Sequence, residues 1–312
     1  MTSEILEKPE SKPGWKSRFK CLVRFGLIAV FCSFLLSLTI GDYFTLTAVF
    51  VYATPWLIRL MVAIAAFAIL RKQLWWMSAT LLISGLHGGH QSYRRGAAIK
   101  HHSAGSFTIA TWNAGRELDD RPSEWHFESD VVAIIESGHF DKPQWRKFQK
   151  STPDYHWLQF ESGTMLGVRG KHAKFESLGE HDLFRCFRVK VTIDHFDPFT
   201  VVVVDMRSQP WLSREEPMRR IFAATKPGEP TIILGDFNTP PDSRWIRKAS
   251  FKRWSLANRR HEQGFVETWP FGLPLHCLDQ IWVSEEFKVL DCKQESRPSD
   301  HRLVKARLLP SS

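Results

Sequence analysis

Residues 233–241 read ILGDFNTPP, and this stretch gives the first indication of the fold. The apolar run over 231–235 predicts a buried strand, and the carboxylate of Asp236 and the amide of Asn238 follow it at once. A carboxylate beside a buried strand costs free energy unless it points into a polar site. The stretch therefore predicts a core strand that places polar side chains in a site. The other residues of that site must lie elsewhere in the chain.

Four further apolar segments carry polar side chains at one end. They are ATWNAG with Asn113, DVVAIIESG with Glu136, CLDQIWVS with Asp279, and PSDHRLV with Asp300 and His301. A single aspartate before a strand is usually a turn residue. Five such placements in one chain indicate a shared polar site at the ends of several strands.

The chain from residue 107 onward predicts many short strands and few helices. Apolar runs predict strands over 107–112, 130–135, 155–160, 164–168, 184–193, 199–204, 231–235, 278–283 and 302–308, and helical patterns cover 142–150 and 214–224. The run FTVVVV (199–204) is apolar on both faces, as expected of a strand that is covered on both sides. Two packed sheets with helices outside them fit this pattern.

The residue types suggest how the site would work. Glu136, Asp300 and the side-chain carbonyl of Asn113 are hard oxygen ligands, which suit Mg²⁺ or Mn²⁺ better than a softer metal. Such an ion, held by only one or two carboxylates, polarises a phosphoryl oxygen. We therefore expect these three residues to bind the metal.

Proton transfer and substrate positioning need further groups. His301 is the candidate general base, and Asp279 is the candidate carboxylate that fixes its tautomer. Asp236 and Asn238 would hold the attacking water or the phosphate. Together with the metal ligands, these residues predict metal-assisted hydrolysis of a phosphoester.

These motifs resemble the endonuclease/exonuclease/phosphatase superfamily. Its order of motifs is matched over roughly residues 105–310 by WN (112–113), the strand ending in Glu136, GDFN (235–238), the strand of Asp279, and SDH (299–301). The resemblance implies an α/β fold, a four-layer α/β sandwich with two central β-sheets, and divalent-metal-dependent hydrolysis of a phosphodiester or phosphomonoester. It also implies Glu136, Asn113 and Asp300 at the metal, and His301, Asp279, Asp236 and Asn238 in catalysis.

One position departs from the family pattern. Many members end the mid-domain strand with a histidine, whereas VVVVDMRSQP places Asp205 there. An ionised aspartate cannot donate a proton and would repel a phosphate. Either Asp205 is protonated in an acidic site, or Arg207 supplies positive charge, or water protonates the leaving group. We keep Asp205 as a candidate catalytic residue, with a purely structural strand-end acid as the alternative.

The N-terminal third predicts a membrane anchor that resembles a known bacterial arrangement of this family. Apolar segments over 22–40, 43–70 and 74–86 predict about three transmembrane helices within 22–88. A basic arm (1–21) precedes them, a linker (89–106) follows, and the catalytic domain covers 107–312. Lys and Arg in the arm and at 71–72 predict that both lie in the cytoplasm and that the catalytic domain lies outside it, on the cell (inner) membrane. Arg94, Arg95 and Lys100 count against this orientation.

Charge and cysteine content limit the functions further. Residues 1–102 hold 12 Lys/Arg and only four Asp/Glu, so most of the net charge of +9 lies outside the catalytic domain. The domain therefore has no bulk charge typical of nucleic-acid binding. Its function is then that of a nuclease or of a phospholipid or small-phosphoester hydrolase, and the alternative is an inactive binding module that retains the fold. No CxxC pair predicts zinc, and Cys277 and Cys292 are either a disulfide or two free thiols.

Overall fold

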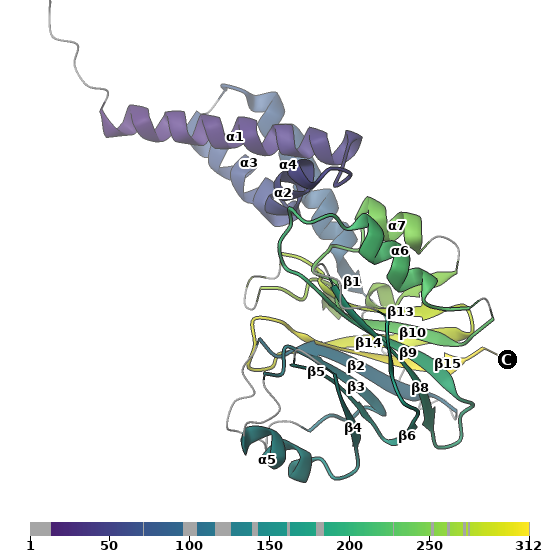
Figure 1. Ribbon diagram of the computed structural model, residues 1–312. Helices are drawn as coiled ribbons and strands as arrows, with labels where there is room; N and C mark the ends of the chain where they lie inside the picture. Colours follow the sequence, from purple (N-terminus) through teal and green to yellow (C-terminus); the bar gives the residue numbers. More distant parts are fainter. Residues whose placement is uncertain are drawn as a thin grey trace, which may run out of the picture.

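Figure 1 shows the computed structural model of the chain, with N-terminal helices at one end and two facing β-sheets at the other. The structure describes residues 14–70, 72–95, 105–115, 126–138, 143–160, 163–178, 184–226, 228–250, 253–260, 263–270, 273 and 275–311. Most of the predicted basic arm and residues 96–104 of the predicted linker lie outside these ranges.

The first sheet has six strands. Their order is β14 (Phe287–Glu295), β15 (Leu303–Pro310), β2 (Phe107–Asn113), β3 (Val131–Ile135), β5 (Thr164–Val168) and β4 (His156–Phe160). β2 and β3 run parallel, so the polar residues at their carboxyl ends reach the same edge of the sheet. The other neighbouring pairs in this sheet are antiparallel.

The second sheet has seven strands. The order is β11 (Trp254–Leu256), β13 (Asp279–Ser284), β10 (Thr231–Asp236), β9 (Phe199–Met206), β8 (Phe184–Ile193) and β6 (Gly170–His172), with β7 (Glu176–Ser177) paired to β8. β9 and β10 are parallel and place Asp205 opposite Asp236. On the other side of β10, Asp236 faces Asp279 of the antiparallel β13. The register alone thus brings three acids together.

The two sheets pack against each other through aliphatic side chains. Fully buried residues such as Val131, Val201, Ile232 and Val304 form this central core. Both faces of β9 are buried, as the FTVVVV run predicts. Each sheet therefore needs a second cover on its outer face.

Helices supply that cover. Met218 and Ile221 of α6 (Glu215–Ala223) and Trp245 of α7 (Arg244–Ala249) pack on the seven-stranded sheet. Trp145 and Phe148 of α5 (Pro143–Ser151) pack on the six-stranded sheet. The predicted four-layer α/β sandwich with two central sheets is confirmed. The short α7 was not predicted, because six residues are too few to display helical periodicity.

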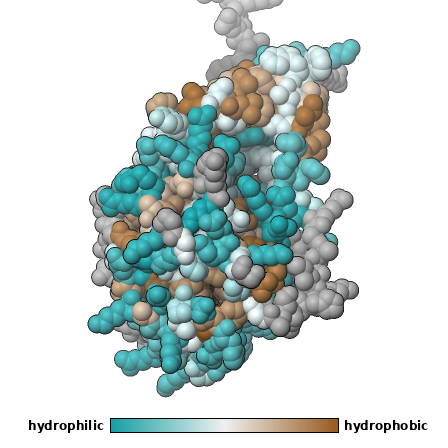
Figure 2. All heavy atoms as spheres, turned by 90° about the vertical axis from the view of Figure 1, so that its right-hand side faces the viewer, coloured by the Kyte–Doolittle hydropathy of each residue, from teal (hydrophilic) through white to brown (hydrophobic). Residues whose placement is uncertain are grey.

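The N-terminal helices are α1 (Trp15–Thr39), α2 (Thr45–Ala53), α3 (Trp56–Leu70) and α4 (Trp75–Ser92). Among the described residues, α1 alone is long and apolar enough to cross a membrane, and α2 with α3 qualifies only as a pair bent by 62°. Pro55 lies at that break, where proline cannot continue the hydrogen-bond ladder. The third predicted span, over 74–86, belongs to α4, which does not meet the same criterion. Figure 2 shows apolar side chains exposed at this end of the molecule.

Residues 89–95, expected in the linker, instead continue the folded structure. They complete α4 and form β1 (Tyr93–Arg95), which pairs with β12 (Gln263–Phe265). Glycines of α4 serve helix packing. A Cβ on Gly85 would lie 2.9 Å from the backbone nitrogen of Leu60, and one on Gly88 would lie 2.4 Å from the Cβ of Trp56. These glycines let α4 approach α3 closely.

Cys277 and Cys292 are both buried and free, so the disulfide alternative is not formed.

Candidate active site

The strand ends converge on one cleft of about 640 Å³. Asn113 ends β2, Glu136 follows β3, Asp236 ends β10, and Asp300 and His301 precede β15. All five line the cleft, as does Asn238. The sheet topology, rather than closeness in sequence, brings them together from positions nearly two hundred residues apart.

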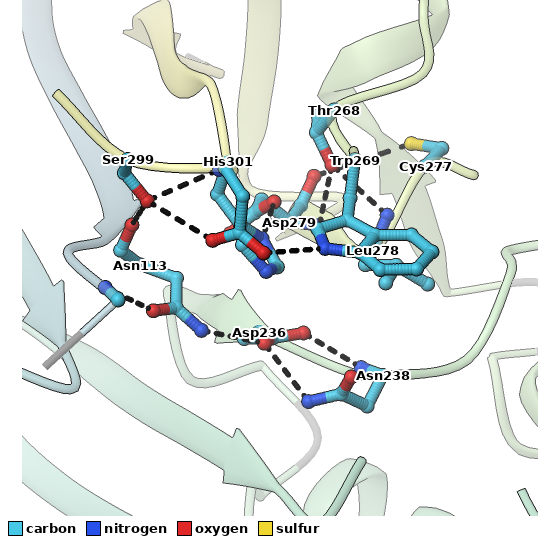
Figure 3. A network of polar contacts seen from close by, with 12 residues as sticks. Asn113, Asp236, Asn238, Thr268, Trp269, Cys277, Leu278, Asp279, Ser299 and His301 are labelled. Atoms are coloured by element: carbon cyan, nitrogen blue, oxygen red, sulfur yellow. Dashed lines mark hydrogen bonds and ion pairs between the residues drawn. The ribbon is translucent and has the colours of Figure 1, made fainter. Parts of the chain in front are cut away.

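Asp236 is the centre of a hydrogen-bond network (Figure 3). Its Oδ2 accepts from the side-chain Nδ2 of Asn113 at 2.8 Å and from that of Asn238 at 2.9 Å. Its Oδ1 accepts from the backbone nitrogen of Asn238 at 2.8 Å. The side-chain oxygen of Asn113 accepts from the backbone of Gly115. Both amides therefore fix the carboxylate of Asp236, which is itself fully buried.

The backbone around these residues explains why the sequence reads Gly-Asp-Phe-Asn. A Cβ on Gly235 would lie 1.9 Å from the carbonyl oxygen of Val204, so only glycine permits the close approach of β9 and β10. Asn238 has a φ of 43° and Glu136 a φ of 53°, and both are left-handed conformations that cost free energy in residues other than glycine. Such conformations occur often where a side chain must point into a functional site.

His301 and Asp279 form a buried pair. The Nδ1 of His301 lies 2.8 Å from the Oδ2 of Asp279, and their side chains are 7% and 0% exposed. The backbone nitrogen of Asp279 donates to the Oγ1 of Thr268 at 3.0 Å. With Nδ1 engaged by Asp279, Nε2 is the ring nitrogen left for the cleft. This is the geometry of a histidine oriented by a carboxylate.

Asp300 is held by a neighbour that the sequence did not reveal. The indole Nε1 of Trp269 donates to its Oδ2 at 2.8 Å. Ser299 links the segment before β15 to β2, its neighbour in the six-stranded sheet, because its Oγ donates to the backbone carbonyl of Asn113 at 2.7 Å and accepts from the backbone nitrogen of His301. The SDH segment is thereby tied to the end of β2.

The environment shifts the pKa values of the two central groups upward. Burial raises the pKa of Asp236 to about 7, with the charge of Asp279 adding to the effect and that of His301 opposing it. Burial alone would lower the pKa of His301, but the charge and hydrogen bond of Asp279 outweigh it and raise that pKa to about 10. Perturbed pKa values of this kind are typical of functional sites.

Asp205 is buried beside the site and forms an ion pair with Arg185. It is 7% exposed, and the NH1 of Arg185 lies 3.3 Å from its Oδ2. Burial raises the pKa of Asp205 to about 6, Arg185 lowers it, and the nearby charge of Glu136 raises it. Asp205 is not among the described residues that line the cleft. Its ion pair on the sheet is compatible with a structural role, and its catalytic role stays a prediction.

The oxygen ligands of the cleft fit a hard divalent cation that binds only a few protein side chains. Three carboxylates line the cleft, those of Glu136, Asp236 and Asp300, and no lysine or arginine is among its described lining residues. An anionic phosphate would meet repulsion there without an added cation. No three or more His, Cys, Asp or Glu side chains of the described residues form a closed metal cluster. Mg²⁺ needs no such cluster, since it keeps water and substrate oxygens as ligands.

Several neighbours of the site escaped the sequence analysis. Trp269 and Thr268 lie in a loop without periodicity, and nothing in the sequence links them to Asp300 or Asp279. Arg214 is 2% exposed, and its NH2 donates to the backbone carbonyl of Asn238 at 3.3 Å. Val49 and Ala53 of α2 also line the cleft, although their sequence had indicated only a membrane segment.

Comparisons with known proteins agree with this architecture. A sequence model of the Endonuclease/Exonuclease/phosphatase family matches residues 110–301. A search of curated proteins by sequence found no significant match.

Solved structures with this fold are similar at low sequence identity. An endonuclease/exonuclease/phosphatase family protein of Bacteroides thetaiotaomicron has a TM-score of 0.51 and 15% identity, over 68% of this chain and 100% of the other. The mannosyl-6-phosphatase Bt3783 of the same organism has a TM-score of 0.50 and 15% identity, over 65% and 99%. The catalytic domain of human Nocturnin, with bound sulfate, has a TM-score of 0.50 and 15% identity, over 68% and 97%. At these identities the similarity establishes the fold alone.

Proposed function

Because the chain belongs to the endonuclease/exonuclease/phosphatase family, we propose that it is a membrane-anchored, divalent-metal-dependent hydrolase of phosphoesters. The observation that carries the proposal is the convergence of Glu136, Asp236, Asp300 and His301 on one cleft. Members of this family are hydrolases that act on phosphoesters.

Each residue has a role that follows from its contacts. His301, oriented at Nδ1 by Asp279, takes the proton of the attacking water at Nε2. Asp236, fixed by Asn113 and Asn238, accepts a hydrogen bond from that water and aligns it with the phosphorus. The water then attacks in line with the ester bond that breaks.

Glu136 and Asp300 would hold Mg²⁺ or Mn²⁺, with the side-chain carbonyl of Asn113 nearby. When bound, the cation would polarise a phosphoryl oxygen and offset the negative charge of the cleft. Its charge beside Asp300 would also lower the pKa of His301, because like charges disfavour the protonated imidazole. Trp269 keeps the carboxylate of Asp300 in place for this role.

The membrane location rests on the apolar helices and the distribution of basic residues. The carboxyl end of α1 and both α2 and α4 contact the catalytic domain, whereas the turn at 72–74 lies at the far end of the helices (Figure 1). We therefore propose that the N-terminal arm and this turn lie in the cytoplasm and the catalytic domain outside it, with α4 as the last crossing.

A substrate panel tests the proposal. The full-length chain in detergent micelles would be assayed on bis(p-nitrophenyl) phosphate, p-nitrophenyl phosphate, DNA oligonucleotides and phospholipids, with Mg²⁺ or Mn²⁺ and then with EDTA. We expect metal-dependent turnover of at least one substrate, and a loss of roughly 10²-fold or more in His301→Asn. The exposed His156→Asn is the matched control and should keep the wild-type rate.

Failure would be equally clear. If no substrate is turned over with either metal while phosphoester ligands still bind, the chain is a binding module that retains the fold. If turnover persists in excess EDTA, the metal requirement is wrong.

A further inference from the structure

The N-terminal helices are docked on the catalytic domain rather than tethered to it. Asp42, in the turn after α1, accepts hydrogen bonds from the backbone nitrogen of Arg244 at 2.9 Å and from the hydroxyl of Ser243. Its other partner is the hydroxyl of Tyr52 on α2, at 2.7 Å. On α3, the indole Nε1 of Trp56 donates to Glu267 at 2.7 Å. This docking fixes α2 beside the catalytic cleft.

α2 presents an apolar stripe that leads into this cleft. Leu46, Val49, Phe50 and Ala53 are spaced three, four and seven residues apart and so share one face of the helix. Leu46 and Phe50 are 71% and 51% exposed, while Val49 and Ala53 line the cleft itself. The wall of an otherwise polar catalytic site thus continues outward as an exposed apolar surface.

The length of α2 places this stripe at the membrane surface. Nine residues make about 14 Å of helix, which is less than half of a hydrocarbon core of about 30 Å. The helix carries no charge, and it lies between α1 and α3, which extend away from the catalytic domain (Figure 1). An exposed apolar helix in this position lies in the interface of the bilayer, with the cleft opening beside it.

The junction is also positively charged. A second cavity of about 820 Å³ shares Tyr52, Pro240 and His276 with the catalytic cleft. Its lining residues include five arginines, Arg59, Arg94, Arg244, Arg247 and Arg259, against three acids, Asp42, Asp242 and Glu267, so basic groups are in excess. Basic side chains at the level of the headgroups attract anionic lipids. Charge and apolar surface therefore favour the same class of ligand.

We infer that the substrate is an anionic phospholipid of the bilayer, whose acyl chain lies along the α2 stripe while its phosphate reaches the cleft. This inference rests on the proposed function. A water oxygen forms the new bond to phosphorus, the bond from phosphorus to one ester oxygen breaks, and that oxygen leaves as an alcohol after taking a proton. The acyl chain of the lipid stays along α2 and in the membrane throughout the reaction.

The test uses the full-length chain in vesicles of dioleoyl phosphatidylglycerol, with Mg²⁺ or Mn²⁺. Bis(p-nitrophenyl) phosphate, which has no acyl chain, is assayed in parallel on the same preparation. Val49→Asn places a polar amide on the stripe within the cleft. We expect the ratio of lipid turnover to bis(p-nitrophenyl) phosphate turnover to fall about tenfold in this variant, the scale of losing one buried aliphatic contact.

Ile64→Asn is the matched control. Ile64 is an exposed β-branched residue of α3, 55% exposed and outside the cleft. It should keep the wild-type ratio, whereas a general effect of asparagine on membrane insertion would lower the turnover of both variants alike. If the ratio of lipid turnover to bis(p-nitrophenyl) phosphate turnover is unchanged in Val49→Asn, the inference that the acyl chain lies along the α2 stripe is wrong.

The remaining outcomes separate the two proposals. Hydrolysis of bis(p-nitrophenyl) phosphate without any lipid hydrolysis overturns the lipid inference and leaves the phosphoesterase intact. Faster cleavage of DNA oligonucleotides than of lipid also overturns it. If neither phosphoester is hydrolysed with either metal, the proposed function itself fails.

Discussion

Replacing Asp279 with asparagine tests the role of the buried pair with His301. The carboxylate lies 2.8 Å from Nδ1 and outweighs the burial that would otherwise lower the pKa of His301. The rise from 6.5 to about 10 corresponds to roughly 5 kcal/mol, at about 1.36 kcal/mol for each pH unit. Without the charge of Asp279, burial is the largest remaining influence on this pKa and lowers it, while the smaller effects of Asp236 and Asp300 oppose it. We therefore expect the pKa of His301 in Asp279→Asn to fall below 6.5.

The sign of the effect on stability follows from the same numbers. A histidine whose pKa is raised in the folded state stabilises the fold fully below its unfolded pKa, and this contribution is lost as the pH rises towards about 10. Near pH 6 the free energy of unfolding should therefore be higher in wild type than in Asp279→Asn, by up to roughly 5 kcal/mol. The difference should shrink steadily towards pH 10.

The assay follows the protonation of His301 directly. The chain is labelled with ¹³C at histidine Cε1, prepared in micelles without metal, and titrated from pH 5.5 to 9, with the His301 resonance assigned from its loss in His301→Asn. The wild-type resonance should not titrate in this range, and the variant resonance should move below pH 6.5. The rate of phosphoester hydrolysis should fall by roughly 10²- to 10⁴-fold.

A buried aspartate elsewhere provides the control. Asp291 is 5% exposed and lies on β14, away from the cleft, so Asp291→Asn should leave the His301 titration unchanged. The reasoning is refuted if wild-type His301 titrates near 6.5, or if it fails to titrate below 9 in Asp279→Asn.

The other predictions concern the neighbours of the site. Asp205→Ala should lower the rate roughly 10²-fold or more if this acid takes part in catalysis; a near-normal rate would leave it only the structural ion pair with Arg185. Trp269→Phe removes the indole donor to Asp300 and should weaken Mn²⁺ binding about tenfold, measured by titration of the purified chain; unchanged binding would show that Asp300 needs no such support. Asp42→Ala leaves buried donors unpaired at a cost of about 1–3 kcal/mol and should lower the melting temperature in micelles by several degrees; an unchanged value would mean that the docking contributes no stability.

The core of the fold was predictable because its signals are local. A run such as IILGD or VVAIIE shows both the strand and the polar residue at its end, so Asp236 and Glu136 could be assigned to one site. The pairing order of the strands was not visible in the sequence, yet the site needed only the polar end of each strand, whether carboxyl or amino, to meet the others. The close approach of β9 and β10 explains in retrospect why Gly235 precedes Asp236.

The rest depends on contacts between distant segments. Trp269 donates a hydrogen bond to Asp300, thirty-one residues further along the chain, and no sequence periodicity predicts such a bond. The glycines of α4 are as typical of a linker as of close helix packing, and only the partner helix distinguishes the two. The apolar sequence of α2 indicates a membrane segment, but it does not reveal that Val49 would line a catalytic cleft.

The most direct test of the whole account is Mn²⁺ binding by the full-length chain in micelles, followed by the EPR signal of the free ion, in wild type and in Glu136→Gln. Glu128→Gln is the control, because that side chain is 91% exposed. We expect Glu136→Gln to bind Mn²⁺ at least about tenfold more weakly, with phosphoester turnover falling in parallel, and Glu128→Gln to match the wild type. Equal Mn²⁺ binding by Glu136→Gln and wild type would contradict a metal-dependent site built on the strand ends.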